Sequence, residues 1–186
     1  QEIARDTGST YISPYNDPMI VSGQGTIGIE LDNQLKSIDE VIVSVGGGGL
    51  ISGIGGYLKQ VQPQIQMVAC SPKNSCVMYE SLNAGRILDL PSKQTLSDGT
   101  AGGVEEGSIT FDICKEIIDK FILVTEKEII SGIRNTIDND HQLIEGSAGA
   151  AIAAFVKSKD RLIGKKVVII ICGGNINSNT LSKILP

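Results

Sequence analysis

The stretch Val41-Ile-Val-Ser-Val-Gly-Gly-Gly-Gly-Leu50 decides the fold class of this chain. Its first half is almost wholly apolar and does not alternate with polar residues, so it predicts a strand over residues 40–45 that is covered on both faces. Four glycines follow directly and lead into a helix expected over residues 50–60. A strand, a glycine turn and a helix in this order are typical of the ligand-binding edge of a parallel sheet.

The rest of the chain repeats this alternation. Further strands are expected over residues 10–13, 65–70, 121–124 and 165–171. Helices are expected at 2–7, 26–35, 76–83, 110–118, 126–139 and 146–157, with a last helix after a second glycine turn at 172–175. Strands that alternate with helices indicate βαβ units. We therefore predict an α/β fold with a mainly parallel twisted sheet and helices on both faces.

Composition excludes several classes of protein. The chain has 186 residues, 16 of them basic and 21 acidic, for a net charge of −5. Because it has no basic stripe and only 4% aromatic residues, no nucleic-acid partner is expected. It has no run of 18 apolar residues, so no membrane span is expected either. Four cysteines without a CxxC pair and a single histidine, His141, predict buried, reduced thiols in a cytoplasmic protein and no zinc site. His141 is expected at the surface or at a helix cap.

The run Gly46 to Gly49 predicts a phosphate cradle. Without Cβ atoms, the backbone N–H groups can approach an anion at the start of a helix. The loop has no lysine before Leu58, so it is not a nucleoside-triphosphate loop, and the dinucleotide pattern GxGxxG fails at Ser52. The alternative is a tight turn that only allows close helix packing.

Four further stretches, taken with this loop, carry a family resemblance: Asp17-Pro-Met-Ile-Val-Ser-Gly-Gln-Gly-Thr26, Ser97-Asp-Gly99, Leu143-Ile-Glu-Gly-Ser-Ala-Gly-Ala150 and Cys172-Gly-Gly-Asn175. Together they resemble the serine/threonine dehydratase family of pyridoxal-phosphate enzymes, which has the tryptophan-synthase-β fold (fold type II) and includes serine racemase. The first stretch resembles the family's "GQGT" helix start. The resemblance covers nearly the whole chain and implies pyridoxal 5'-phosphate as the cofactor.

The resemblance also implies roles for single residues. Gly46, Gly47, Gly48, Gly49 and Leu50 would hold the cofactor phosphate. Cys172 would face the pyridine nitrogen, where a neutral thiol can form a hydrogen bond but cannot keep the ring strongly protonated, which favours loss of a β-hydroxyl group. Glu145 would lie near the ring, and Asp98 would shape the substrate side.

Each of these side chains also has a simpler interpretation. Cys172 could be a buried thiol at the end of a strand. Glu145 could be a helix-start carboxylate that accepts hydrogen bonds from the N–H groups of residues 146–148. Asp98 could belong to an ordinary Asp-Gly turn.

The chain departs from the family pattern at the Schiff-base lysine. No Ser-x-Lys-x-Arg-like motif is present, and the lysine is expected upstream of Gln1. Lys73 is the least unsuitable substitute, but its Ser-Pro-Lys-Asn-Ser setting predicts a solvated loop. We therefore interpret residues 1–16 as the tail of a smaller domain with a linker, and residues 17–186 as a large cofactor-binding domain that lacks its N-terminal segment.

A divalent metal site is not expected. In serine racemases and some relatives such a cation binds carboxylates just after the strand that here ends at Cys70. The matching residues 70–77 contain no carboxylate, and hard cations need oxygen ligands.

The resemblance implies a pyridoxal-phosphate-dependent dehydratase (ammonia-lyase) that converts L-threonine or L-serine to a 2-oxo acid and ammonia. This chain would be an inactive part of a homo-oligomer, a dimer or tetramer, that acts on a small amino acid. Two alternatives stay open. One is a serine racemase, or a dehydratase of another β-hydroxy amino acid, with the same fold. The other is a non-catalytic phosphate-binding module.

Overall fold

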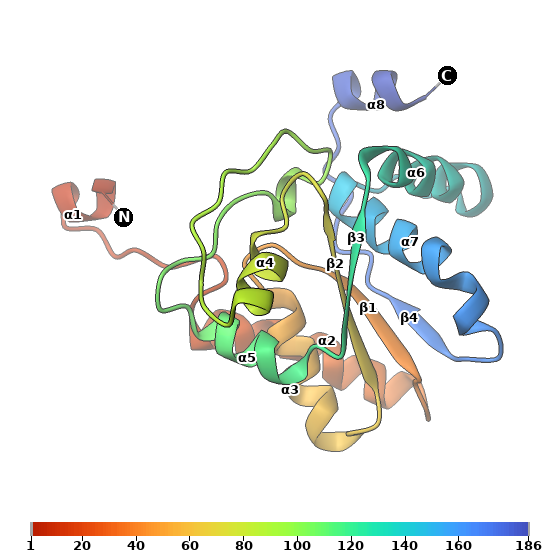
Figure 1. Cartoon of the computed structure of the whole chain (residues 1–186), viewed down its shortest axis with the longest axis horizontal. Coiled ribbons are helices and arrows are strands. Elements are labelled where there is room, and N and C mark those ends of the chain that lie inside the picture. The colour runs from red at the N-terminus through yellow and green to blue at the C-terminus, as the bar shows by residue number, and fades with distance from the viewer. Residues whose placement is uncertain (1, 186) are drawn as a thin grey trace.

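A four-stranded parallel sheet forms the centre of the computed structural model, which describes residues 2–185 (Figure 1). The strands are β1 (Glu40–Ser44), β2 (Gln66–Pro72), β3 (Lys120–Val124) and β4 (Val167–Ile169), in the order β3-β2-β1-β4. All three pairings are parallel; Val41, for example, pairs with Met67 on one side and Val168 on the other. The α/β fold with a parallel sheet is therefore confirmed.

Helices cover both faces of the sheet, as Figure 1 shows. Alternate strand residues point to opposite faces, so Val41 and Val43 join one core cluster and Ile42 joins the other. The first cluster includes residues of α3 (Gly49–Val61), α4 (Val77–Ala84) and α5 (Ile109–Ile117), with α2 (Pro18–Gln34) packed outside α3. The second includes residues of α6 (Glu126–Asp140), α7 (Gly146–Ser158) and α8 (Ser178–Ile184).

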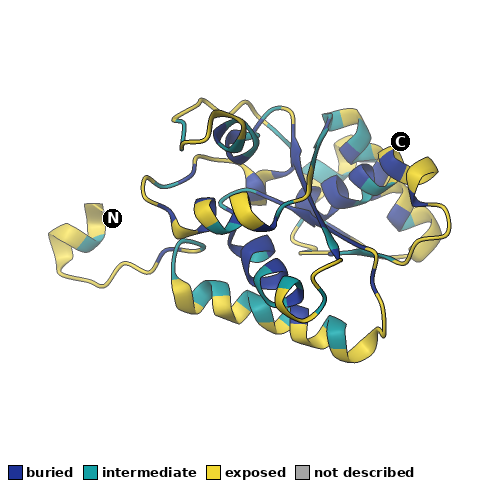
Figure 2. Cartoon of the chain, turned by 60° about the horizontal axis from the view of Figure 1, so that its bottom comes forward, coloured by how far each residue is buried: buried dark blue, intermediate teal, exposed yellow. Residues whose placement is uncertain are grey.

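Burial follows this layering (Figure 2). The central strands and the facing sides of α3 and α7 are dark blue, whereas α1 (Glu2–Thr7) lies away from the sheet and buries no residue. Two short 3-10 turns, Asp98–Thr100 and Lys159–Leu162, complete the regular elements of residues 2–185. None of the helices in that range has the length and hydropathy needed to cross a bilayer.

The start of α2 was predicted wrongly. The expected helix began at Thr26, but α2 begins at Pro18 and is capped by Asp17, whose carboxylate accepts hydrogen bonds from the N–H groups of Met19 (2.7 Å) and Ile20 (3.3 Å). The Ser-Gly-Gln-Gly stretch therefore lies inside the helix rather than at its start. Within this stretch, a Cβ on Gly25 would lie 3.3 Å from the carbonyl oxygen of Gly53 in α3, whereas one on Gly23 would meet no atom within 4 Å. The close approach of the two helices restricts α3 more, since a Cβ on Gly53 would lie 2.3 Å from the carbonyl oxygen of Val21.

The strand expected over residues 10–13 is also wrong. These residues have no regular structure, and the side chains of Tyr11 and Ser13 form hydrogen bonds with Glu105, which is 94 and 92 positions away. The last strand is shorter than expected, since β4 ends at Ile169, although the N–H of Ile170 still donates to Ile42.

A buried carboxylate marks the amino end of β1. The side chain of Glu40 is fully buried, and Arg161 donates to both of its oxygens (2.5 and 2.6 Å). Lys165 donates at 2.9 Å, and the ammonium of Lys120 lies 3.7 Å away. Burial alone would raise the pKa of Glu40, but the hydrogen bonds and these positive charges outweigh it and hold the pKa below the ordinary value. This end of the sheet is therefore held by a satisfied ionic network.

Candidate functional site

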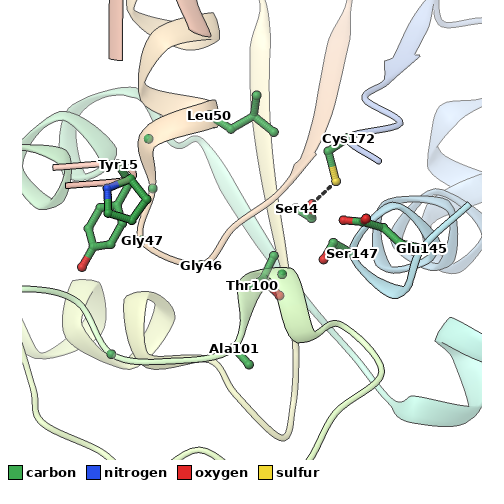
Figure 3. Close-up of a pocket in the computed structure, with 15 residues that line it drawn as sticks. Tyr15, Ser44, Gly46, Gly47, Leu50, Thr100, Ala101, Glu145, Ser147 and Cys172 are labelled. Carbon is green, nitrogen blue, oxygen red and sulfur yellow. Dashed lines mark hydrogen bonds between the residues drawn. The ribbon is translucent and has the colours of Figure 1, made fainter. Parts of the chain in front are cut away.

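A cleft of about 380 Å³ opens at the carboxyl ends of the strands (Figure 3). One wall comes from the turn after β1 and the start of α3, and the opposite wall from the start of α7 and the segment after β4. Its lining residues are Pro14, Tyr15, Ser44, Gly46, Gly47, Gly48, Gly49, Leu50, Gly99, Thr100, Ala101, Gly103, Glu145, Ser147 and Cys172. All the predicted site residues except Asp98 therefore lie around one cavity.

The glycine turn places an uncapped helix end at this cleft. Gly48 has φ 88°, a left-handed conformation that favours glycine, and α3 begins at the next residue. No side chain caps this end, so the first N–H groups of α3 have no side-chain acceptor. These N–H groups, together with the helix dipole, make the turn suitable for an anion.

The same glycines are also required by packing. A Cβ on Gly46 would lie 2.7 Å from the carbonyl oxygen of Thr100, and one on Gly47 would lie 2.5 Å from ring carbons of Tyr15. Close approach by Thr100 and Tyr15, not by a helix alone, thus explains why these positions cannot carry larger side chains. The anion-binding and packing interpretations are therefore compatible.

Cys172 faces Ser44 across the far side of the cleft. Its sulfur lies 3.4 Å from the hydroxyl oxygen of Ser44, the contact that is dashed in Figure 3. Burial and the nearby charge of Glu145 raise the pKa of the Cys172 thiol, with burial the larger effect. The hydrogen bond with Ser44 lowers the pKa, but not enough to cancel them, so the pKa lies above its ordinary value. The thiol is therefore neutral near pH 7. The residue as a whole is exposed, although its sulfur is partly enclosed beside Ser44 and Glu145.

Glu145 connects the start of α7 to the second glycine turn. One carboxylate oxygen accepts a hydrogen bond from the N–H of Asn175 (3.1 Å), and the N–H of Glu145 donates to the carbonyl of Gly173 (3.1 Å). A Cβ on Gly173 would lie 2.5 Å from that oxygen, so a larger residue there would displace the Glu145 carboxylate from its present position. Glu145 precedes α7 but makes no side-chain cap, which contradicts the simpler interpretation of a capping carboxylate.

Asp98 is not brought together with the other predicted residues. It is exposed, and its carboxylate accepts a hydrogen bond from the N–H of the adjacent Gly99 (2.9 Å). The side chain borders a neighbouring polar cavity with Asn175 and Lys183, whereas Gly99 and Thr100 line the cleft itself. The local geometry agrees with a short turn, and a role on the substrate side stays a prediction.

His141 behaves as expected for a capping residue. It ends α6 in the left-handed conformation, with φ 56°, and its N–H donates to the carbonyl of Thr136. It lies outside the cleft lining.

Sequence reasoning did not assign a site role to several of the lining residues, among them Tyr15, Ser44 and Ser147. The hydroxyl oxygen of Ser147 is buried and has no hydrogen-bond partner among residues 2–185. It points toward the cleft beside Thr100 and Glu145 (Figure 3). An unpartnered buried hydroxyl costs free energy, and at the rim of a cavity water or a ligand can supply the partner. The only signal in the sequence was its position inside the stretch from Leu143 to Ala150.

The chain matches known proteins over nearly its whole length. A protein-family model described as "Pyridoxal-phosphate dependent enzyme" matches residues 1–173. The chain is 37% identical over 183 residues to an L-threonine ammonia-lyase of Thermotoga maritima, an alignment that covers 98% of this chain and 45% of that protein. Among curated relatives it therefore spans about half of the whole length.

Solved structures give the same picture. The processed form of threonine deaminase isoform 2 from Solanum lycopersicum superposes with a TM-score of 0.92 at 34% identity, covering 98% of this chain and 54% of that one. Maize serine racemase superposes with a TM-score of 0.88 at 32% identity, covering 98% and 57%. Both superpositions cover nearly the whole of this chain and little more than half of the other chain.

Proposed function

The chain belongs to the family of pyridoxal-phosphate-dependent enzymes, and we propose that the whole protein is a dehydratase (ammonia-lyase) that converts L-threonine or L-serine to a 2-oxo acid and ammonia. One observation carries the proposal. The uncapped start of α3 and the neutral thiol of Cys172 face a single cleft from opposite sides. An anion site and a neutral hydrogen-bonding group at the two ends of one cavity suit a phosphorylated pyridine.

The phosphate side of the cleft fits this cofactor. Residues 46–50 would accept the phosphate through backbone N–H groups, because α3 has no competing side-chain cap. No lysine or arginine lines this part of the cleft in the described residues 2–185. Binding would therefore depend on N–H donors and the helix dipole, which need the close backbone approach that only glycine permits.

The far side fits a pyridine ring. Cys172 can form a hydrogen bond with the ring nitrogen without giving up a proton, since its pKa is raised. Bound pyridoxal phosphate supplies an electron sink for amino-acid chemistry, and a neutral partner at the nitrogen weakens that sink. Ser44 fixes the orientation of the thiol at 3.4 Å. Such an arrangement favours elimination of a β-hydroxyl group over reactions that need a long-lived carbanion.

Two further groups of this chain would act on the bound ligand. The carboxylate of Glu145 is held by Asn175 on one oxygen, which leaves the other able to orient a polar group of the ligand. The buried hydroxyl of Ser147 would donate a hydrogen bond and so gain the partner that it lacks.

A Schiff-base lysine is still required. No lysine lines the cleft within residues 2–185, and Lys73 is exposed, with its backbone N–H bonded to Val124. We propose that the lysine comes from a part of the whole protein outside these 186 residues, with residues 1–16 as the connection to a smaller domain. Homo-oligomerisation and a cytoplasmic location belong to the same proposal.

The test uses the whole protein. After purification with pyridoxal phosphate, L-threonine and L-serine are supplied separately, and 2-oxo acid and ammonia are measured. Equal amounts of both products from at least one substrate are expected. If cofactor binds but neither product forms from any β-hydroxy amino acid, the dehydratase proposal is wrong. If no D-serine accumulates either, a non-catalytic phosphate-binding module is favoured.

Serine racemase is the second candidate, because the maize enzyme of that name superposes on the chain with a TM-score of 0.88. Chiral analysis of the same L-serine reaction separates the two. A racemase would accumulate D-serine without stoichiometric ammonia, whereas a dehydratase would release ammonia and leave little D-serine. 3-Hydroxyaspartate, supplied in parallel, tests for a dehydratase of another β-hydroxy amino acid.

A further inference from the structure

Four hydrogen bonds connect Glu105 to the segment 11–16. One carboxylate oxygen accepts from the hydroxyl groups of Tyr11 (2.9 Å) and Ser13 (3.1 Å). The other accepts from the side-chain amide of Asn16 (2.8 Å). The backbone N–H of Glu105 donates to the hydroxyl oxygen of Tyr15 at 2.8 Å. A single residue thus holds a segment about ninety positions away in the sequence, and we call these contacts the Glu105 clasp.

The orientation of the Asn16 side-chain amide is determined by its hydrogen bonds. Its amide carbonyl accepts from the N–H of Ile109 (3.0 Å), so its amide NH2 must face Glu105. The backbone N–H of Asn16 in turn donates to the hydroxyl of Ser13 (3.0 Å). The clasp therefore joins residues 11–16 to the loop before α5 through groups whose donor and acceptor roles are all assigned.

Tyr15 connects the clasp to the cleft. Its ring packs against Gly47, where a Cβ would lie 2.5 Å from ring carbons, and its own Cβ lies 2.9 Å from the position of a Cβ on Gly49. Burial raises the pKa of the Tyr15 hydroxyl, so the group stays neutral and can accept from the N–H of Glu105. The tyrosine is half-buried and forms a wall of the cleft beside the glycine turn.

Resting on the proposed function, we propose that Glu105 is a positioning residue for cofactor retention. Its carboxylate holds residues 11–16 in place, so that the ring of Tyr15 remains against Gly47 and Gly49 and closes the outer side of the phosphate loop. Residues 9–13 have no regular structure that could hold the tyrosine instead. Without the clasp, the segment regains conformational freedom, and the loop loses its wall.

The clasp has a chemistry that can be broken and rebuilt. A carboxylate only accepts hydrogen bonds, and all three side chains facing Glu105 donate. Glu105→Gln keeps the shape but replaces one accepting oxygen with an NH2 group. If that group faces Asn16, two NH2 groups meet; if it faces Tyr11 and Ser13, their hydroxyl groups can no longer donate to this residue. Adding Asn16→Asp turns the contact between the two NH2 groups into a matched donor and acceptor, while an aspartate oxygen can still accept from Ile109.

The experiment uses the full-length holoenzyme and measures the rate at which the cofactor is lost after transfer to cofactor-free buffer. Glu105→Ala is expected to speed this loss about tenfold, the effect of about 1.4 kcal/mol of lost hydrogen bonding. Glu105→Gln should fall between wild type and Glu105→Ala. The pair Glu105→Gln with Asn16→Asp should return to within about twofold of wild type. The control is Glu106→Ala, which removes an exposed carboxylate next in the chain.

The outcomes distinguish the two proposals. If the wild-type protein holds no cofactor, the proposed function fails. If it holds cofactor and Glu105→Ala loses it no faster than Glu106→Ala, the clasp proposal alone is wrong. The thermal midpoint of each variant is measured in the absence of cofactor. Should Glu105→Ala fail to fold, the paired variant decides: a cofactor-loss rate that stays at the level of Glu105→Gln overturns the proposal.

Discussion

The two ends of the sheet differ in whether their polar side chains have partners within the protein. At the amino end of β1, the fully buried Glu40 accepts hydrogen bonds from Arg161 and Lys165. At the carboxyl end, Glu145 has no cation within ion-pair distance among residues 2–185, and the hydroxyl of Ser147 has no partner in the same range. One end is complete within this chain, and the other contains unused hydrogen-bonding capacity.

The difference separates stability from ligand binding. A buried charge without a partner is costly, so the network around Glu40 must be satisfied for the sheet to form. Unsatisfied groups at the cleft can persist where water or a ligand supplies the missing partners, and parallel sheets bind ligands at their carboxyl ends. Substitutions at the amino end should therefore change stability, and substitutions at the carboxyl end should change cofactor affinity.

The strongest test of this division is Gly46→Ala in the whole protein. The added Cβ would lie 2.7 Å from the carbonyl oxygen of Thr100 and 2.8 Å from its Cα, and neither backbone atom can move away easily. We expect cofactor affinity, measured by equilibrium titration, to fall about a hundredfold. Gly56→Ala is the matched control: it lies in α3 with no atom within 4 Å and should slightly raise stability. Equal affinity in the two variants would contradict our assignment of the phosphate loop.

At the amino end, Glu40→Gln is expected to lower the free energy of unfolding by about 2 kcal/mol, with cofactor affinity unchanged. Arg161 and Lys165 lose the negative charge that they share. Both are partly exposed, so water can replace part of the hydrogen bonding that they lose. Denaturant unfolding of the whole protein measures the loss. Lys157→Met, which removes an exposed pair with Glu128, should cost less than about 1 kcal/mol. A lower cofactor affinity of Glu40→Gln would contradict the assignment of stability to the amino end and ligand binding to the carboxyl end.

Acid should affect the amino end through the same carboxylate. The folded-state pKa of Glu40 lies below the ordinary value of 4.5, so its contribution to stability is present above pH 4.5 and is lost as pH falls through the folded-state value. The free energy of unfolding of wild type should therefore decrease below about pH 4.5 more steeply than that of Glu40→Gln. Glu105 and Glu128 also have lowered pKa values, but both proteins contain them, so the difference between the two curves reports Glu40. Parallel curves would contradict the role of its ionic network.

The smallest effect is expected for Ser147→Ala. Loss of one neutral hydrogen bond to the ligand should weaken cofactor binding about fivefold. The cofactor-free protein should be no less stable, because the hydroxyl has no partner to lose. Affinity and thermal midpoint are compared with those of Ser158→Ala, which lies at the other end of α7. Unchanged affinity together with reduced stability would mean that Ser147 belongs to the structural part of the protein.

Local sequence determined the sheet and most of the helices. Residues 40–45 and 65–70 are apolar runs long enough for strands only, and β1 and β2 lie there with one or two residues of difference. The start of α6 was equally readable, because Thr125 and Glu128 form a capping box within four residues. The glycine turns after two strands predicted a site at the edge of the sheet where the cleft lies.

Local sequence failed where a residue acts through a distant partner. The start of α2 was hidden because its glycines lie inside the helix and not in a turn: Gly25 and Gly28 face α3, and Gly23 faces open space. Residues 10–13 looked like a strand, but their side chains bind Glu105. No spacing rule could connect positions about ninety residues apart, so the clasp and the Tyr15 wall were invisible.

The amino-acid sequence by itself thus determined the α/β class, the parallel order of strand and helix, and the position of the glycine loop, since periodicity and backbone preference act over a few residues. Only the tertiary structure decided which side chains complete the cleft. It placed Tyr15 against Gly47, brought Cys172 to 3.4 Å from Ser44, and left Ser147 without a partner. These relations arise when chain segments far apart in sequence pack together, because hydrogen bonding and burial depend on what is near in space.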